Sequence, residues 1–484
     1  MGIFRTHNVA EYDQVDGIVI DETAPPGGIQ GVGTGLAILV GQFERGSDAM
    51  TRMASLVDFH QRYGKSSYSG NVQLKNKKFS ALKIIRVVAS DAVKGTKTFA
   101  SAVPTDTIKF DAKWKGVYGN KIRVTIEAGS VSGKKYTIED TNTNASEFFP
   151  TEVYDNIAIA GAAAAFLATP SKLVDVTVLS TVGEPANAAA TFLTSGSDGT
   201  VADTDYETAI AKAEVENAGN ILFLDVYNST RNSYLKIHAG ITMDKIVICS
   251  HAEADDVSDN IAAVATLRDV DGFIIFAENW VGTLIDGLEA FTSPASWYAS
   301  ILSQTHPKVD PAYAGNAQLL YGVTSLKNIH TRDEYIQLMQ AGISAFEQDL
   351  DIGFKIKSGV VTQIANTSKL TVLRRRMATY LTDSIGKFLK IYQNDVNSQS
   401  NRDNVKAAIS NFDTQQENLG VLPKDSEVTG GKAKLIDIKS LNTNDTIAAG
   451  KFYIKYKRRI FSSMRFIVLI AEIGESVVVT EQDE

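Results

Sequence analysis

Apolar residues recur at helical spacing over a long stretch in the last third of the chain. They keep to one face of a helix of about seven turns. The set is Leu370, Leu373, Met377, Tyr380, Leu381, Ile385, Phe388, Leu389, Tyr392 and Val396. Because an apolar stripe of this length is unfavourable in water, we expect the helix to be buried against another element.

Two strand patterns follow this helix. Residues 451–459 alternate between polar and apolar side chains, which is the period of a half-buried strand. Residues 465–471 are apolar almost throughout, which is typical of a strand covered on both faces. The C-terminal part of the sequence is therefore predicted to combine a long helix with strands.

The middle of the chain alternates between helical and apolar strand patterns. Helices are expected over 206–216 and 257–267, and strands over 221–226, 245–249 and 272–276. Continuous apolar strands separated by helices indicate an α/β layer with a largely covered sheet. The early segment 31–88 is the expected partner of this layer.

Short strands bounded by turn residues, such as 107–110 and 120–126, interrupt this pattern. The sequence therefore predicts an α+β, multidomain chain with an inserted, mostly-β domain. The expected parts are an N-terminal arm at 1–22, a discontinuous middle α/β domain at 23–98 plus 199–345, the inserted domain at 99–198, and a C-terminal α/β domain at 346–484.

Composition is that of soluble globular material, with 44% hydrophobic and 21% charged residues. The single cysteine, Cys249, excludes an internal disulfide and indicates folding in a reducing compartment; we expect it to be a small buried hydrophobe. Charged residues among positions 2–20 argue against a secretory signal, and the longest apolar run, roughly 157–168, is too short to span a bilayer.

Charge is distributed unevenly along the chain. The net charge of −8 argues against nucleic-acid binding by the whole surface. Residues 1–22 carry one arginine and five acidic residues, a net charge of −4, whereas residues 451–465 carry six basic residues and no acid. An acidic arm and a basic strand of this kind can attract one another within a chain or between chains.

The sequence shows little sign of catalysis. The six histidines are scattered without a His-Glu-x-x-His pair, and the glycine-rich segment 31–41 precedes a strand instead of following one, so it does not fit a phosphate loop. We expect no catalytic, cofactor-binding or metal-binding residues. One alternative, an α/β enzyme of unknown chemistry, would rest on an acidic cluster: Asp255, Asp256, Asp259, Asp269 and Asp271.

Several segments, in order, resemble the contractile tail sheath proteins of bacteriophages and related injection machines. The segment 18–41, which contains Pro25-Pro-Gly-Gly28, looks like the family's opening segment, and 56–64 is similar to its next helix and turn. The Gly-x-x-Gly-Asn turn at 116–120 and the Gly-Ser-Asp-Gly turn at 196–199 resemble the start and end of the family's inserted domain. The likeness continues to 418–421, but 353–360 departs from the family's tryptophan-containing strand.

This resemblance implies a structural subunit that forms hexameric rings stacked helically around a tail tube. On this reading the C-terminal domain is the sheath core domain, and terminal strands link neighbouring copies. Strand addition depends on main-chain hydrogen bonds, so it needs exposed β-prone termini. The expected linking residues are Asp16, Gly17, Ile18, Val19, Ile20, Phe466, Ile467, Val468, Leu469 and Ile470.

Contraction under this reading would need no nucleotide, because each subunit moves to better-packed contacts. The helix region 369–397 has a net charge of +4, and we expect one basic set on or beside its face to meet the tube. That set is Lys369, Arg374, Arg375, Arg376, Lys387 and Lys390. A helix packed in its own domain with solvated basic residues is the alternative interpretation.

The partners implied are other copies of the chain, a tail tube protein, and baseplate and tail terminator proteins, with no direct nucleic acid and no membrane insertion. The resemblance implies a virion tail, assembled in the host bacterial cytoplasm and used for genome ejection. A phage-derived bacteriocin or a cellular contractile injection system is the alternative setting, because the physics of the sheath is shared.

Overall fold

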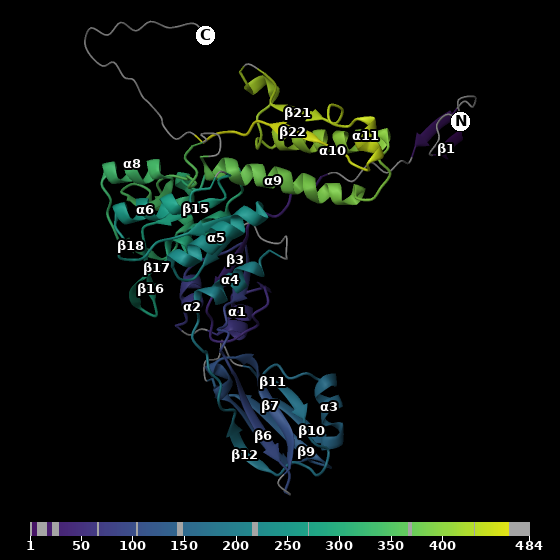
Figure 1. The fold of residues 1–484 in the computed structure, drawn as a ribbon, viewed down its shortest axis with the longest axis vertical. Helices are drawn as coiled ribbons and strands as arrows, with labels where there is room; N and C mark the ends of the chain where they lie inside the picture. The colour runs from purple at the N-terminus through teal and green to yellow at the C-terminus, as the bar shows by residue number, and fades with distance from the viewer. Residues whose placement is uncertain are drawn as a thin grey trace. The chain divides into compact units, whose positions relative to one another are not determined.

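The structure is a computed structural model of the 484-residue chain. It describes residues 2–6, 17–21, 29–64, 67–102, 105–142, 149–214, 221–269, 271–365, 370–429 and 431–463. The chain forms two compact units: a larger unit, Gly31–Phe388, and a smaller unit made of Met1–Gln30 and Leu389–Glu484. Figure 1 labels their helices and strands.

An eight-stranded sheet forms the centre of the larger unit. Its order is β20 (Gly353–Ile356), β19 (Ile343–Asp349), β15 (Ile274–Glu278), β14 (Ile246–Cys249), β13 (Ile221–Leu224), β3 (Leu36–Gly41), β5 (Ala81–Arg86) and β4 (Thr51–Met53). Neighbours from β19 to β5 run parallel, and the two edge strands pair antiparallel. Every residue of β13, β14 and β15 is buried, as their continuous apolar sequences predict.

Alternate residues of each strand pack against opposite layers. Ala37 and Leu39 face a core that contains Trp297 of α7 (Pro294–Gln304), and α1 (Leu56–Tyr63) and α2 (Ser69–Leu74) also contribute to this core. Ile38 and Val40 face the second core. That core is closed by α4 (Asp203–Ala211), α5 (Ser229–Thr242), α6 (Val257–Leu267) and α8 (Arg332–Ala341). The expected α/β layer is therefore present, and Cys249 is fully buried in it.

Two antiparallel sheets form the β-rich part of the larger unit. One contains β6 (Lys94–Ala100), β7 (Asp106–Lys115) and β11 (Val174–Val178); the other contains β8 (Ile122–Ala128), β9 (Lys134–Asp140), β10 (Glu152–Ile157) and β12 (Ala188–Phe192). They share one core with α3 (Ile159–Ala168), in which Phe110 and Tyr136 are fully buried. A 3₁₀ turn, Val117–Lys121, links β7 to β8.

The larger unit also carries a small sheet of β17 (Leu288–Thr292), β16 (Val281–Ile285) and β18 (Val323–Leu326), with a 3₁₀ turn at Ala314–Leu319. The boundary predicted at 345 differs from the structure, because it falls inside β19. That strand and β20 continue the central sheet, and the larger unit extends to Phe388 through most of α9 (Val372–Leu389).

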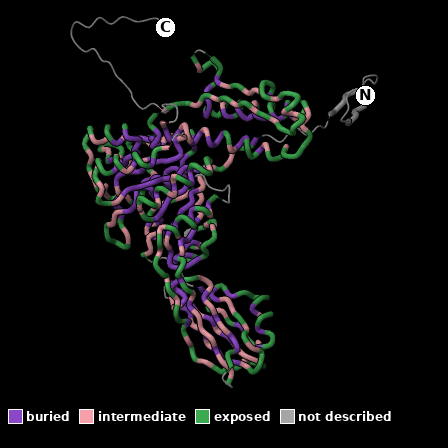
Figure 2. Tube along the Cα trace, in the orientation of Figure 1, coloured by how far each residue is buried: buried purple, intermediate pink, exposed green. Residues whose placement is uncertain are grey.

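The smaller unit contains a long helix and short strands. β1 (Gly2–Thr6) pairs parallel with β2 (Gly17–Asp21), and β21 (Lys434–Asp437) pairs antiparallel with β22 (Lys455–Arg458). The helices are α10 (Gln399–Asn418) and α11 (Asn444–Ala448), with 3₁₀ turns at Lys390–Tyr392 and Asp425–Glu427. Figure 2 shows buried residues throughout the central sheet of the larger unit, whereas β21 and β22 contain only half-buried and exposed residues.

Candidate functional site

The helix α9 ends earlier than its apolar pattern predicts. Its buried face contains Leu373, Met377, Leu381 and Ile385, as expected. Beyond Leu389 the chain makes one 3₁₀ turn, and Val396 at the end of the predicted stripe is 73% exposed. Asn394 has a left-handed backbone conformation with φ of 67°, so a right-handed α-helix cannot continue through this residue. The stripe is therefore a helix of 18 residues followed by a turn.

Arg376 is the most deeply buried of the described residues in the predicted tube-facing set, at 4% exposure. Its guanidinium donates to the backbone oxygens of Leu302 at 2.7 Å and Thr305 at 2.9 Å. These carbonyls lie at the C-terminal end of α7, where they lack helical partners and where a positive charge is favourable. Burial lowers the pKa of Arg376 to about 10. Arg376 therefore binds α9 to α7 and presents little surface to another protein.

Arg375 is half-buried and also engaged within the larger unit. Its guanidinium lies 4.2 Å from the centre of the Phe273 ring and donates to the backbone oxygen of Asp271 at 3.3 Å. Burial lowers its pKa. Further along α9, burial and the nearby Asp244 carboxylate raise the pKa of Asp383 to about 6.

The remaining basic residues of the set are more accessible. Arg374 is half-buried, Lys387 and Lys390 are exposed, and Lys369 lies outside the described residues. Lys387 belongs to the larger unit and Lys390 to the smaller one. Contact with a tube stays a prediction. Within the predicted tube-facing set, the exposed Lys387 and Lys390 are the residues most accessible to another protein. Sequence reasoning missed the role of Arg376 because a run of three arginines gives no sign of which one faces a helix end.

Buried polar contacts hold β21 and β22 against α10 in the smaller unit. Glu417 pairs with Lys434 at 3.1 Å and with Arg458 at 2.9 Å. The fully buried Asp413 accepts a hydrogen bond from the Tyr456 hydroxyl at 2.7 Å, and burial raises the pKa of this carboxyl. These contacts position a two-stranded sheet that would be marginal alone.

The outer edges of this sheet are open in the described part of the chain, since β21 and β22 pair only with each other. Open edges present unpaired backbone donors and acceptors to another strand. A cavity of about 400 Å³ lies beside them. It is lined by Lys432, Ala433, Lys434, Leu435, Lys457, Arg458 and Arg459. This basic surface suits an extended acidic segment.

The predicted linking strands are only partly described. Gly17, Ile18, Val19 and Ile20 lie in β2, which pairs in parallel with Gly2–Arg5 of β1. Asp16 and the C-terminal set Phe466, Ile467, Val468, Leu469 and Ile470 lie outside the described residues. Their linking role stays a prediction.

Four of the five residues in the acidic cluster that supported an enzyme alternative cap turns or a helix. Asp256 and Asp259 form a reciprocal capping box at the start of α6. Asp255 accepts from the backbone of Ala252, and Asp269 accepts from that of Phe273. These four carboxylates thus accept hydrogen bonds from nearby backbone N–H groups. Among the described residues, no group of three or more His, Cys, Asp or Glu could hold a metal ion, and no described helix is long and apolar enough to cross a membrane.

The fold is that of contractile tail sheath proteins. The sheath tail protein of Listeria innocua matches with a TM-score of 0.65 at 14% identity, covering 89% of this chain and 96% of that one. The sheath tail protein of Desulfitobacterium hafniense matches with a TM-score of 0.62 at 15% identity, covering 92% and 100%. The helical sheath of the anti-feeding prophage in its contracted state matches with a TM-score of 0.58 at 12% identity, covering 96% and 99%.

No family model matches this chain. No curated protein matches it either. The likeness is therefore one of fold, spread over nearly the whole chain and nearly the whole of each solved protein.

Proposed function

We propose that this chain is the structural subunit of a contractile tail sheath. Copies of it polymerise as stacked hexameric rings around a tail tube, and contraction of the sheath drives the tube through the envelope of a target cell. The chain acts through contacts and not through catalysis. The observation that carries this proposal is the match of fold over 89–96% of the chain to three sheath proteins.

Two features of the chain support assembly by strand addition. The sheet of β21 and β22 has open, basic edges, and residues 1–22 carry a net charge of −4 with β-prone Gly17–Asp21. An acidic strand that adds to a basic edge in another copy gains main-chain hydrogen bonds and opposite charge. Such a contact is heterologous, so it propagates from copy to copy instead of closing as a dimer.

The sheath belongs, on this proposal, to a bacteriophage virion tail used in genome ejection. A phage-derived bacteriocin or a cellular contractile injection system is the second candidate, and the match to the sheath of the anti-feeding prophage favours it. The tube, baseplate and tail terminator proteins are the partners proposed beyond the chain itself. The exposed Lys387 and Lys390 are proposed to contribute to the tube contact.

Electron microscopy of the purified chain at rising concentration tests this function. We expect hollow tubes or stacked rings, and we expect deletion of residues 1–22 to abolish them while the larger unit stays folded. A control removes two negative charges without touching a terminal strand, by Asp106→Asn with Glu127→Gln, and should still assemble. A chain that remains monomeric up to its solubility limit would contradict the proposal.

A further inference from the structure

A pocket of about 540 Å³ lies in the larger unit, away from the elements assigned to assembly above. Phe59, Leu74, Leu284, Ile285 and Tyr321 give it apolar walls. Leu284 and Tyr321 are 53% and 54% exposed, so the mouth of the pocket is apolar too. This volume is in the range of pockets that bind drug-sized ligands.

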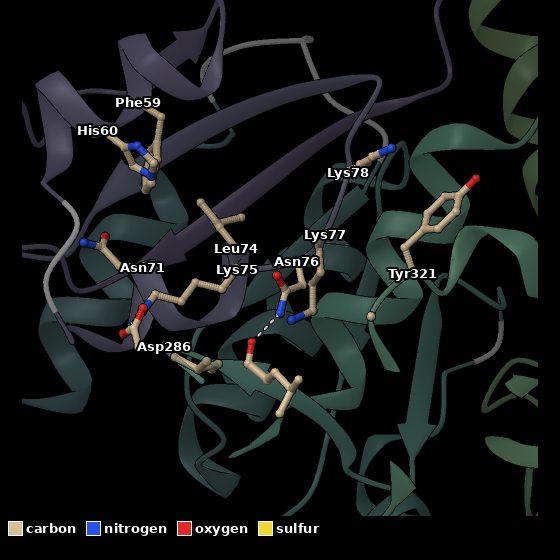
Figure 3. Close-up of a pocket in the computed structure, with 13 residues that line it drawn as sticks. Phe59, His60, Asn71, Leu74, Lys75, Asn76, Lys77, Lys78, Asp286 and Tyr321 are labelled. Atoms are coloured by element: carbon tan, nitrogen blue, oxygen red, sulfur yellow. Dashed lines mark hydrogen bonds and ion pairs between the residues drawn. The ribbon is translucent and has the colours of Figure 1, made fainter. Parts of the chain in front are cut away.

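One wall of the pocket is basic. Figure 3 shows Lys75, Asn76, Lys77 and Lys78 along one segment, with Asp286 facing Lys75. Lys75 pairs with Asp286 at 2.7 Å. Lys77 instead lies over the ring of Trp297 and donates to the Thr292 hydroxyl at 3.3 Å, and Lys78 lies over the ring of Tyr321. Within the described residues neither lysine has a carboxylate partner.

Two further observations indicate that this wall of the pocket binds a ligand. Asn71 lines the pocket and is 3% exposed, yet neither polar atom of its amide has a hydrogen-bond partner. Buried amides in folded proteins are nearly always satisfied, so an orphaned one facing a cavity suggests a missing ligand. Burial lowers the pKa of Lys77 well below its ordinary value, and an incoming carboxylate would favour its charged form.

The same unit carries a projection of matching chemistry at the turn between β19 and β20. Leu350 is 99% exposed, and Ile352 is 42% exposed. Asp351 between them is exposed and has no ion-pair partner among the described residues. Asp349 fixes the turn, because its carboxylate accepts from the backbone of Asp351 and Ile352 at 3.0 and 3.1 Å. The turn thus presents two apolar side chains and one carboxylate in a set geometry.

The turn cannot reach the pocket of its own chain by a small movement. The basic wall leads directly into β5, and the turn joins β19 to β20 at the opposite edge of the sheet. Five strands separate β20 from β5 in the sheet order. At the usual spacing of strands this is a lateral distance of about 30 Å. A projection on one edge and a matching pocket on the other define a heterologous contact between copies.

We propose that the turn at Leu350, Asp351 and Ile352 of one copy inserts into the Lys77 and Lys78 pocket of the next copy. Leu350 meets the apolar walls, Asp351 pairs with the lysines, and the amide of Asn71 bonds to the backbone of the turn. This inference rests on the proposed sheath function, and it adds a second contact between copies, independent of the terminal strands.

Charge reversal tests this contact. Asp351→Lys alone and Lys78→Glu alone should each raise the concentration needed for assembly about tenfold, as expected for loss of one close charge pair at an interface. A chain that carries both changes should assemble near the wild-type concentration, because the pair is restored with its signs exchanged. Both positions are exposed, so the fold should be unaffected.

Cysteine crosslinking locates the contact directly, since the native Cys249 is fully buried and does not compete. A chain with Asp351→Cys mixed with a chain with Lys78→Cys should form one disulfide-linked heterodimer on oxidation, and neither chain should form it alone. Ile329→Cys, at a position 91% exposed in the same unit, replaces Asp351→Cys as the control and should give no crosslink to Lys78→Cys.

The outcomes separate the contact from the function on which it rests. Tubes that form at unchanged concentration in both charge-reversal variants, without a crosslink, would overturn the contact and leave the sheath proposal standing. A wild-type chain that never assembles would overturn both. Crosslinking with rescue by the double variant would establish the contact.

Discussion

Strands β13, β14 and β15 of the larger unit are buried along their whole length. In the smaller unit, β21 is half-buried except for the exposed Leu435, and β22 alternates between exposed and half-buried residues. The central sheet is covered by helices on both faces and has seven neighbouring strand pairs. The small sheet has one pair and two open edges within the described residues. The first sheet holds a fold together, and the second is suited to pairing with another chain.

Truncation of a strand residue in each sheet should give the largest contrast. Ile248→Ala removes a side chain that is 1% exposed and leaves a cavity, so we expect the free energy of unfolding of the larger unit to fall by about 4 kcal/mol. Leu435→Ala in β21, at a position 46% exposed, should cost less than about 1 kcal/mol. Denaturant unfolding measures both, and equal losses would contradict the contrast.

Arg376→Leu tests whether this arginine serves the larger unit. The change leaves the backbone oxygens of Leu302 and Thr305 without their donor, so we expect a loss of about 3 kcal/mol in the free energy of unfolding. Lys387→Leu on the same helix is exposed and should change stability by less than about 0.5 kcal/mol. A thermal unfolding series compares them, and a stable Arg376→Leu chain would show that the arginine is not needed inside the unit.

The pH dependence of the larger unit provides a smaller effect. The raised pKa of Asp383, about 6 instead of 3.8, means that the folded state binds this proton more tightly than the unfolded state. The free energy of unfolding should therefore fall as pH rises from 3.8 to about 6. After allowance for partial exposure the change is about 1 kcal/mol.

Asp383→Asn should remove this fall and stabilise the unit by about the same amount at pH 7, whereas the exposed Asp106→Asn should keep the wild-type pH profile. Unfolding measured at a series of pH values checks both variants. If Asp383→Asn keeps the wild-type pH profile, the pH dependence of the free energy of unfolding arises from another residue.

Local pattern was enough for many elements of the larger unit. The helix predicted over 257–267 is α6, and the continuous apolar runs at 221–226 and 245–249 contain β13 and β14. These predictions succeed because burial on both faces leaves a direct trace in sequence. The half-buried character of β22 was indicated only by the alternation of polar and apolar residues at 451–459.

Other features depend on partners that are distant in sequence. The apolar stripe of α9 was predicted to reach Val396, but the turn after Leu389 ends it, and local spacing carries no sign of that turn. The boundary predicted at 345 lies within β19, which pairs with β20, and the local sequence does not indicate this pairing. The pairing of Lys77 and Lys78 with aromatic rings likewise needs residues more than 200 positions away.

Hydrogen exchange of backbone amides as a function of protein concentration tests the central claim most directly, that β21 and β22 are open edges for another copy. Amides in 434–437 or 455–458 should become protected as tubes form, while those of β13, β14 and β15 are protected at every concentration. Tubes that form without any new protection in these segments would contradict the account.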